Sequence, residues 1–173
     1  MNGEKMVAHA ICGSINNYQL LLMFGYSDEY GYSQEKADEL FAQAEKTFLE
    51  KKGLIGDNNM SQVFSIFSLL GYYGHAESLA YEGLMRKCGC GTIQSSYYAW
   101  NCFEKAVKIG GRTLLSSLAY YELGLMYKQG QEVNVDLLKA RTLFMKAVAK
   151  DGNRQAFLQL EEVNDMLRKE KLL

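Results

Sequence analysis

The chain has 173 residues, of which 48% are hydrophobic and 23% are charged, as expected for one globular domain with a hydrophobic core. Its 19 basic and 20 acidic residues give a net charge of -1, so no overall positive field attracts nucleic acid or an anionic membrane surface. The four cysteines lack the spacing of disulfide pairs, which favours a reducing compartment, and we predict a cytoplasmic protein.

The N-terminal part of the chain is predicted to form two helices. The first covers about residues 4–24, where polar residues interrupt the apolar ones too often for a signal peptide or a membrane span. After a turn at residues 25–32, Ser33 can cap a second helix that runs to Lys52. The apolar face of this second helix consists of Ala37, Leu40, Phe41, Ala44 and Phe48.

A further helix is expected at about residues 60–71. Its apolar residues recur at helical spacing and are Val63, Ile66, Phe67 and Leu70. Gly71 and Gly74 mark its exit, because glycine tolerates the backbone conformations of turns. One continuous helix from Met60 to Lys87, kinked at these glycines, is the alternative.

The clearest element is a helical hairpin over residues 117–153. Its apolar stripes are Ala119, Leu123, Met126 and Tyr127 in the first helix, and Ala140, Leu143, Phe144 and Ala147 in the second. Gly130 can close the first helix with a positive φ, and Asp136 can cap the second. A last helix, residues 154–172, has an apolar side and a polar back, which suits the end of a stack of helices.

A single shift along the sequence places an earlier segment on this hairpin and aligns Gly83 with Gly124. The same shift aligns Phe103 with Phe144, Gly89 with Gly130, and Ser95 with Asp136. A longer shift aligns the apolar stripe that begins at Ala37 with the stripe that begins at Ala140. Repetition at a fixed spacing is the signature of stacked structural units.

These units predict an all-α fold, because one hairpin with apolar stripes on both helices cannot bury both alone and must stack on a neighbour. We expect a right-handed α-α superhelix, or solenoid, of about seven or eight helices in a single repeat domain, residues 1–173. Its expected parts are hairpin copies at about residues 5–53, 76–112 and 117–153, an inserted helix at about 60–71, and a capping helix at 154–172.

The small and apolar residues of the best hairpin follow one spacing, at Ala119, Leu123, Gly124, Tyr127, Gly130, Val133, Asp136, Ala140, Ala147, Gly152 and Ala156. This pattern resembles the Sel-one-like repeat, a relative of the tetratricopeptide repeat. The resemblance is weaker in residues 78–111 and weakest in 16–52, and Glu132 stands where the family usually has a second glycine. It implies an α-solenoid whose relatives are mostly adaptors or scaffolds and not enzymes.

By resemblance to tetratricopeptide geometry, part of the first helix of each hairpin faces a concave groove. The groove residues would be Tyr121, Leu125 and Lys128 in the best copy, Ala80, Leu84 and Lys87 in the preceding copy, and Tyr18 and Leu22 in the first. Tyrosine is favoured at interfaces because it joins apolar area to a polar tip. The resemblance implies that the two lysines line up and meet acidic side chains or a terminal carboxylate of a bound protein segment.

Cysteine chemistry offers an alternative of another class, a zinc site. The candidate ligands are Cys88, Cys90, Cys102 and His75. Thiolates and imidazole suit zinc, but Cys102 takes the place of a core leucine, and residues 89–91 match the ordinary turn of the repeat. We therefore predict no metal, no cofactor and no catalytic residue.

The predicted function is a non-enzymatic protein-protein interaction module, an adaptor or scaffold that binds another protein in its concave groove. A narrower alternative is a cytoplasmic immunity or inhibitor protein that masks a toxin. The alternative of another class is a small metal-binding protein or enzyme that uses the cysteine region. Neither nucleic acid nor a membrane is expected as a partner.

Overall fold

The computed structural model describes three segments, which are residues 34–51, 58–110 and 117–170. The predicted helix at residues 4–24, the Ser33 cap, and the groove positions Tyr18 and Leu22 lie outside the described residues.

The described segments form seven α-helices and no strand, which confirms the predicted all-α fold. The helices are α3 (Gln34–Lys51), α4 (Asn58–Tyr72), α5 (Ala76–Cys88), α6 (Ser96–Gly110), α7 (Leu118–Gln129), α8 (Leu137–Asp151) and α9 (Arg154–Lys169). Of these helices, none has the length and apolar character needed to cross a membrane.

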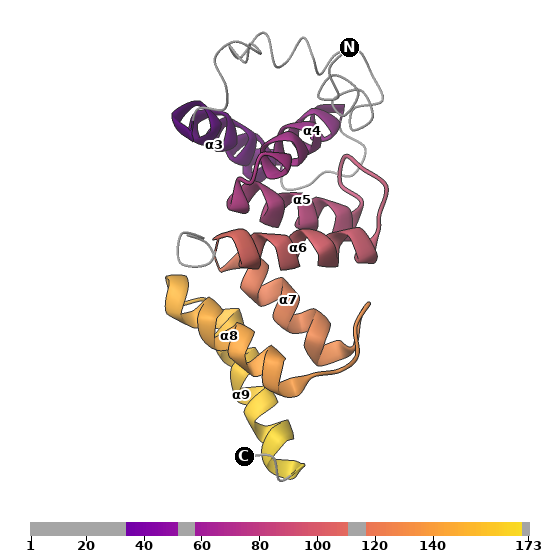
Figure 1. Cartoon of the computed structure of the whole chain (residues 1–173), viewed down its shortest axis with the longest axis vertical. Helices are drawn as coiled ribbons and strands as arrows, with labels where there is room; N and C mark the ends of the chain where they lie inside the picture. The colour runs from indigo at the N-terminus through magenta and orange to yellow at the C-terminus, as the bar shows by residue number, and fades with distance from the viewer. Residues whose placement is uncertain (1–33, 52–57, 111–116, 171–173) are drawn as a thin grey trace.

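The helices stack one after another along the longest axis of the molecule (Figure 1). Helices α3 and α4 form one end, α5, α6 and α7 follow in order, and α8 and α9 form the other end. Each helix packs mainly against the helices before and after it in the chain. This arrangement is a solenoid, in which each hairpin completes the core of its neighbour.

The segment from Met60 to Lys87 forms two helices, so the alternative of one kinked helix is wrong. In the turn between α4 and α5, Gly74 has a φ of +91°, a conformation that side chains disfavour. The ring of His75 then caps α5 by accepting a hydrogen bond from the Ser78 N–H at 3.2 Å. This turn reverses the chain and lets α5 pack beside α4.

The turns of the hairpins α5–α6 and α7–α8 have the same backbone geometry. Gly89 and Gly130 each have a φ of +70°, and their N–H groups donate to the carbonyls of Met85 and Met126. Two positions further on, the chain is again left-handed, with a φ of +68° at Gly91 and +62° at Glu132. The register that aligns Gly83 with Gly124 in the sequence therefore holds for the backbone of both turns.

Both second helices begin with the predicted caps. The Ser95 hydroxyl accepts a hydrogen bond from the Tyr98 N–H at 3.3 Å. The Asp136 carboxylate accepts one from the Lys139 N–H at 2.8 Å. Each cap satisfies an N–H group of the first turn that has no partner within its own helix.

The aligned glycines occupy equivalent packing environments. A Cβ atom at Gly83 would lie 2.7 Å from Cε1 of Phe103, and one at Gly124 would lie 2.7 Å from Cε1 of Phe144. Both aromatic rings are fully buried. Glycine thus lets the ring of the second helix rest directly on the backbone of the first, and the same environment recurs in the next hairpin.

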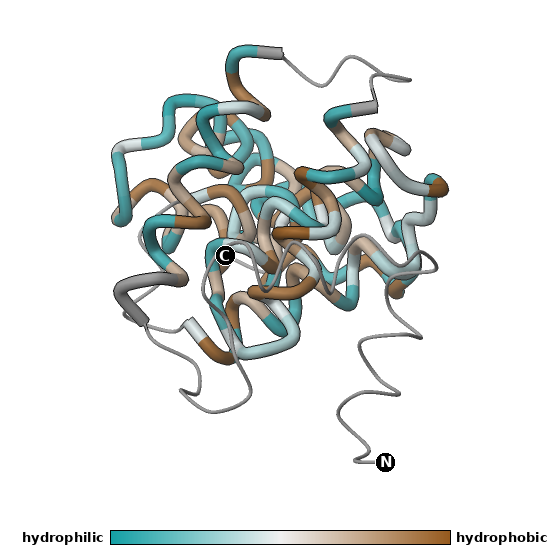
Figure 2. The backbone as a smooth tube through the Cα atoms, turned by 90° about the horizontal axis from the view of Figure 1, so that it is seen from above, coloured by the Kyte–Doolittle hydropathy of each residue, from teal (hydrophilic) through white to brown (hydrophobic). Residues whose placement is uncertain are grey.

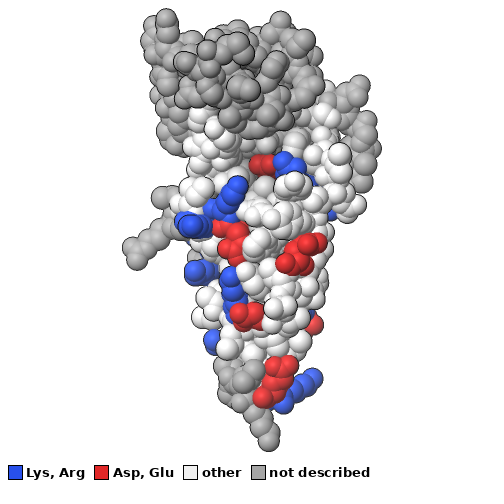
Figure 3. Space-filling model, turned by 45° about the vertical axis from the view of Figure 1, so that its right-hand side comes forward, with Lys and Arg blue, Asp and Glu red and all other residues white. Residues whose placement is uncertain are grey.

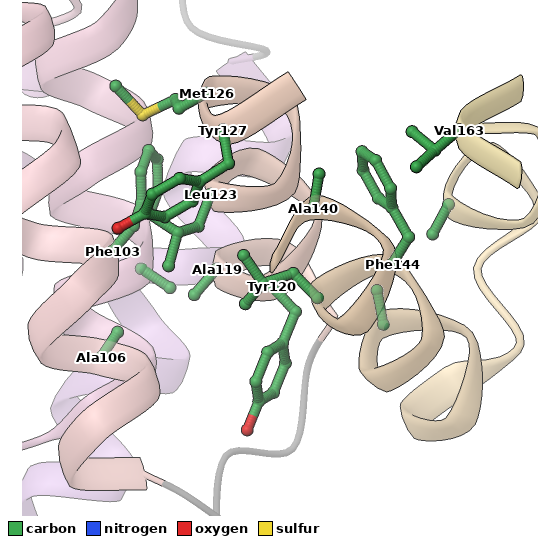
Figure 4. Packing of buried hydrophobic residues seen from close by; sticks show 14 of the residues in the cluster. Phe103, Ala106, Ala119, Tyr120, Leu123, Met126, Tyr127, Ala140, Phe144 and Val163 are labelled. Atoms are coloured by element: carbon green, nitrogen blue, oxygen red, sulfur yellow. The ribbon is translucent and has the colours of Figure 1, made fainter. Parts of the chain in front are cut away.

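The main core runs through both hairpins and reaches α9. Figure 4 shows side chains of α7, among them Leu123 and Met126, between those of α6 and α8. Small residues with no exposed area lie among them and allow the helices to approach closely; these are Ala106, Ala140 and Ala147. Each large side chain buried in this way contributes roughly 1.5 to 3 kcal/mol.

A second core cluster joins α3, α4 and α5. Its centre is the fully buried Phe67, whose ring centroid lies 5.0 to 6.4 Å from those of Tyr81, Phe41 and Phe48. In the predicted apolar stripe of α3, Ala44 and Phe48 belong to this cluster and Phe41 packs against it. Ala37 and Leu40 form a smaller cluster with Leu70 of α4. Hydrophobic and hydrophilic stretches alternate along the tube in Figure 2, as one-sided helices require.

Candidate functional site

In the middle of α7, the partly accessible residues form a narrow strip at the positions that were expected to face the groove. From Ala119 to Lys128 the helix is buried except at Tyr121, Leu125 and Lys128, which are half-buried. Their spacing of i, i+4 and i+7 places them on one side of the helix. We call these three residues the α7 strip, since any partner that contacts the middle of α7 must contact them.

The equivalent positions on α5 divide into two groups. Leu84 and Lys87 are half-buried, as at the α7 strip. Ala80 has no exposed area and belongs to the main core, so it offers no surface to a partner. The reason is side-chain size, because an alanine does not reach beyond its neighbours at the position where Tyr121 does.

Both lysines have acidic partners within the chain. Lys87 Nζ lies 2.6 Å from Glu122 Oε2 on α7. Lys128 Nζ lies 2.6 Å from Glu162 Oε2 on α9 and also donates to the Gln159 side chain at 2.8 Å. The first pair therefore joins α5 to α7, and the second pair joins α7 to α9. The predicted role of these lysines, meeting the carboxylates of a bound segment, is thus taken by residues of the chain itself.

The burial of these pairs gives them a structural role. The side chains of Lys87 and Glu122 are 33% and 10% exposed, and those of Lys128 and Glu162 are 13% and 55% exposed. Such pairs contribute roughly 0.5 to 1 kcal/mol, and the Lys128 pair contributes less than the Lys87 pair because water screens the Glu162 carboxylate. The pairs therefore fix how α5, α7 and α9 lie relative to one another, and with them the shape of the exposed strip.

The proposed zinc ligands do not come together. No three His, Cys, Asp or Glu side chains in the described segments are placed to hold one metal ion. Cys88 is exposed and its thiol donates to the Leu84 carbonyl, whereas Cys90 and Cys102 are buried. Burial raises the pKa of the Cys102 thiol to about 12. His75 is occupied as the cap of α5 and as a partner of Asp38 at 3.2 Å.

A hollow of about 460 Å³ lies beside the turn between α7 and α8, a feature that the sequence reasoning missed. It is lined by Tyr127, Asn134, Val135, Asp136, Leu137, Leu138, Leu167 and Glu170. Val135 and Leu138 are more than half exposed. Neither residue belongs to the apolar stripe that α8 buries in the core. An apolar residue outside such a stripe stays at the surface, and this is the feature of the sequence that could have indicated the hollow.

A polar network adjoins the hollow at Tyr127, one of its lining residues. The Tyr127 hydroxyl donates to Glu104 at 2.7 Å, and Lys139 contacts both that hydroxyl and the Glu104 carboxylate. Burial lowers the pKa of Lys139, but the hydrogen bonds to Tyr127 and Glu104 outweigh it, so the pKa lies above its usual value. Lys139 therefore stays charged and holds α6, α7 and α8 together at this point.

Comparison with known proteins shows the fold. No family model matches the sequence, and a search of curated proteins gives no match. The chain is similar to the solved structure of a protective antigen present in uropathogenic Escherichia coli strains, described as displaying an SLR fold. The TM-score is 0.65 and the identity 18%, over 94% of this chain and 33% of that chain.

A Sel1 repeat protein from Oxalobacter formigenes is also similar, with a TM-score of 0.57 and 17% identity, over 84% of this chain and 58% of that chain. The chain thus spans a third of one of these proteins and somewhat more than half of the other. Both likenesses agree with the repeat pattern in the sequence. The chain has the helical solenoid fold of Sel1-like repeats.

Proposed function

We propose that this chain is a non-enzymatic protein-interaction module, an adaptor or scaffold that binds a partner protein along its first helices. The fold supports this proposal, because stacked helical hairpins offer long preformed surfaces on which a partner binds without ordering the module. The α7 strip carries the proposal, since it is the accessible part of the otherwise buried segment from Ala119 to Lys128.

The neighbouring helices extend the α7 strip with apolar side chains. Leu84 on α5 is half-buried at the position equivalent to Leu125. On α9, Ala156 and Leu160 follow the spacing of Ala119 and Leu123, which makes Leu158 the equivalent of Tyr121. Leu158 is 51% exposed. We call the set of Leu84, Tyr121, Leu125 and Leu158 the recognition face.

The chemistry of the recognition face favours an apolar segment of the partner. The lysines next to it on α5 and α7, Lys87 and Lys128, pair with Glu122 and Glu162, so charge contributes little net attraction. Aromatic and aliphatic anchors in a polar rim are the usual arrangement of residues that dominate binding energy. The proposed partner therefore inserts aliphatic or aromatic side chains between the first helices.

Photo-crosslinking tests the location of the recognition face. A photoreactive amino acid at position 121 or 125 should capture the partner, whereas the same amino acid at the exposed Thr142 of α8 should not. With the captured protein purified, Tyr121→Ala and Leu125→Ala should each weaken binding about tenfold or more, at unchanged helix content by circular dichroism. Equal capture at position 142, or undiminished affinity of both variants, would refute the proposal.

The same experiment separates an adaptor from an inhibitor. Several captured proteins would fit the adaptor or scaffold that we propose. A single captured protein whose activity is lost in the complex would instead assign the masking role of an immunity protein.

A further inference from the structure

The second helices of the hairpins differ from the first helices in charge. Helices α6 and α8 together carry six basic residues against two acidic ones, whereas α5 and α7 together carry three of each. The net charge of -1 for the whole chain hides this separation. Basic charge is thus concentrated on a different set of helices from the recognition face.

Three of the six basic residues of α6 and α8 form neither an ion pair nor a hydrogen bond with a side chain of the described segments. Lys139 pairs with Glu104, Arg141 donates to Asn164, and Lys150 is also engaged. The other three, Lys105, Lys108 and Lys146, are exposed, and no carboxylate of the described segments forms an ion pair with them. Lys146 lies over the Tyr120 ring at 5.8 Å and keeps its charge at the surface.

The repeat brings these lysines into line. Lys105 aligns with Lys146 in the register that places Gly83 on Gly124, so the two hold the same position in successive hairpins. Lys108 lies one turn after Lys105 on α6. Lys and Arg side chains lie along the left part of the described surface in Figure 3, with Asp and Glu side chains among them. We call Lys105, Lys108 and Lys146 the lysine row.

Apolar side chains lie next to the lysine row in the sequence and remain exposed. Ile109 is 53% exposed and Met145 is 47% exposed. A surface that mixes uncompensated lysines with exposed apolar residues attracts a partner by charge and gains affinity by apolar contact.

We propose that the lysine row is a second docking surface, which binds an acidic segment of a protein partner with apolar residues among its carboxylates. A membrane-binding basic patch has about four to eight basic residues, and a nucleic-acid surface neutralises several phosphates. Three lysines beside Ile109 and Met145 match a short acidic protein segment better than either. This surface is independent of the recognition face and requires no change there.

A labelled peptide of repeated Glu-Glu-Leu units is the probe, and fluorescence anisotropy at low ionic strength measures its affinity. Lys105→Glu with Lys146→Glu should weaken peptide binding about tenfold, and added salt should weaken binding to the unaltered protein. The matched control is Lys46→Glu with Lys169→Glu, which changes the net charge equally at exposed positions of α3 and α9 and should leave the affinity nearly unchanged.

Three results would overturn the proposal. They are no binding of the peptide to the unaltered protein, equal losses in the row variant and the control, or tighter row-dependent binding to anionic lipid vesicles or duplex DNA. Circular dichroism confirms that each variant is folded. Because Tyr121 and Leu125 are unaltered in these variants, the outcome is independent of the test of the recognition face.

Discussion

Glu132 and Gly91 occupy equivalent positions in the turns of the two hairpins. They show how a side chain at this position affects the stability of the turn. Both have a left-handed φ, +62° and +68°. At Gly91 a Cβ would lie 2.2 Å from the Met60 carbonyl oxygen, so space as well as backbone conformation requires glycine. The Glu132 side chain is exposed, and its cost is that of the left-handed backbone alone, roughly 1 to 2 kcal/mol.

Glu132→Gly should stabilise the protein by about 0.5 to 1 kcal/mol, because the relieved backbone cost exceeds the added freedom of the unfolded chain. Urea unfolding measures the change. The matched substitution Gly91→Ala should destabilise by about 3 kcal/mol, since it adds both strain and a clash. A Glu132→Gly protein that is less stable than the parent would show that Glu132 is not strained.

Thiol labelling tests the burial of the cysteines residue by residue. In the folded protein at about pH 8, iodoacetamide should modify Cys88 while Cys90 and Cys102 stay protected until denaturant is added. The thiolate is the reactive form, and burial raises the pKa of Cys102 to about 12. Peptide mass spectrometry assigns each site. Rapid modification of Cys102 without denaturant would contradict its place in the core.

Within one hairpin, local spacing predicted most of the structure. Glycine closes the first helix at Gly130, and Ser95 and Asp136 cap the second helices, as expected. Each of these features depends on residues of the same hairpin. Their chemistry is therefore visible in a single sequence.

Features that depend on how hairpins meet were not predicted. The ion pair of Lys87 with Glu122 joins two hairpins and exists only because α7 lies beside α5. Ala80 was expected at the surface because Tyr121 is its equivalent, but the shared position does not imply shared exposure when the side chains differ in size. The hollow beside α8 likewise forms between elements distant in sequence.

The contact between the glycine of the first helix and the aromatic ring of the second helix can be tested by its effect on the stability of the hairpin. Gly124→Ala should destabilise by about 1 to 3 kcal/mol, because the new methyl group would lie 2.7 Å from the Phe144 ring. Phe144→Leu alone leaves a cavity and should also destabilise. The double variant should lose less stability in urea unfolding than the sum of the two. Additive losses would mean that Gly124 and Phe144 are not in contact.

Over the whole molecule, the stacking of hairpins explains both the stability of the fold and the difference in surface chemistry between first and second helices. Six of the 13 residues of α5 and seven of the 12 residues of α7 are buried, and ion pairs join α5 to α7 and α7 to α9. The proposed recognition face lies among the residues that stay accessible. Helices α6 and α8 expose one side and carry three lysines that form no ion pair within the described segments. The sequence predicted the solenoid, whereas the location of available charge depended on pairing that only the structure shows. The predicted cytoplasmic location stays a prediction.

Proton NMR of isotope-labelled protein tests the central claim most directly, namely that successive hairpins repeat one packing unit. The account predicts nuclear Overhauser contacts between the Gly83 Hα and the Phe103 ring protons, and equal contacts between the Gly124 Hα and the Phe144 ring protons. The ring currents of Phe103 and Phe144 should also shift the Hα resonances of Gly83 and Gly124 from their usual positions. Contacts in one hairpin without the other, or in neither, would contradict the repeat and the recognition face built on it.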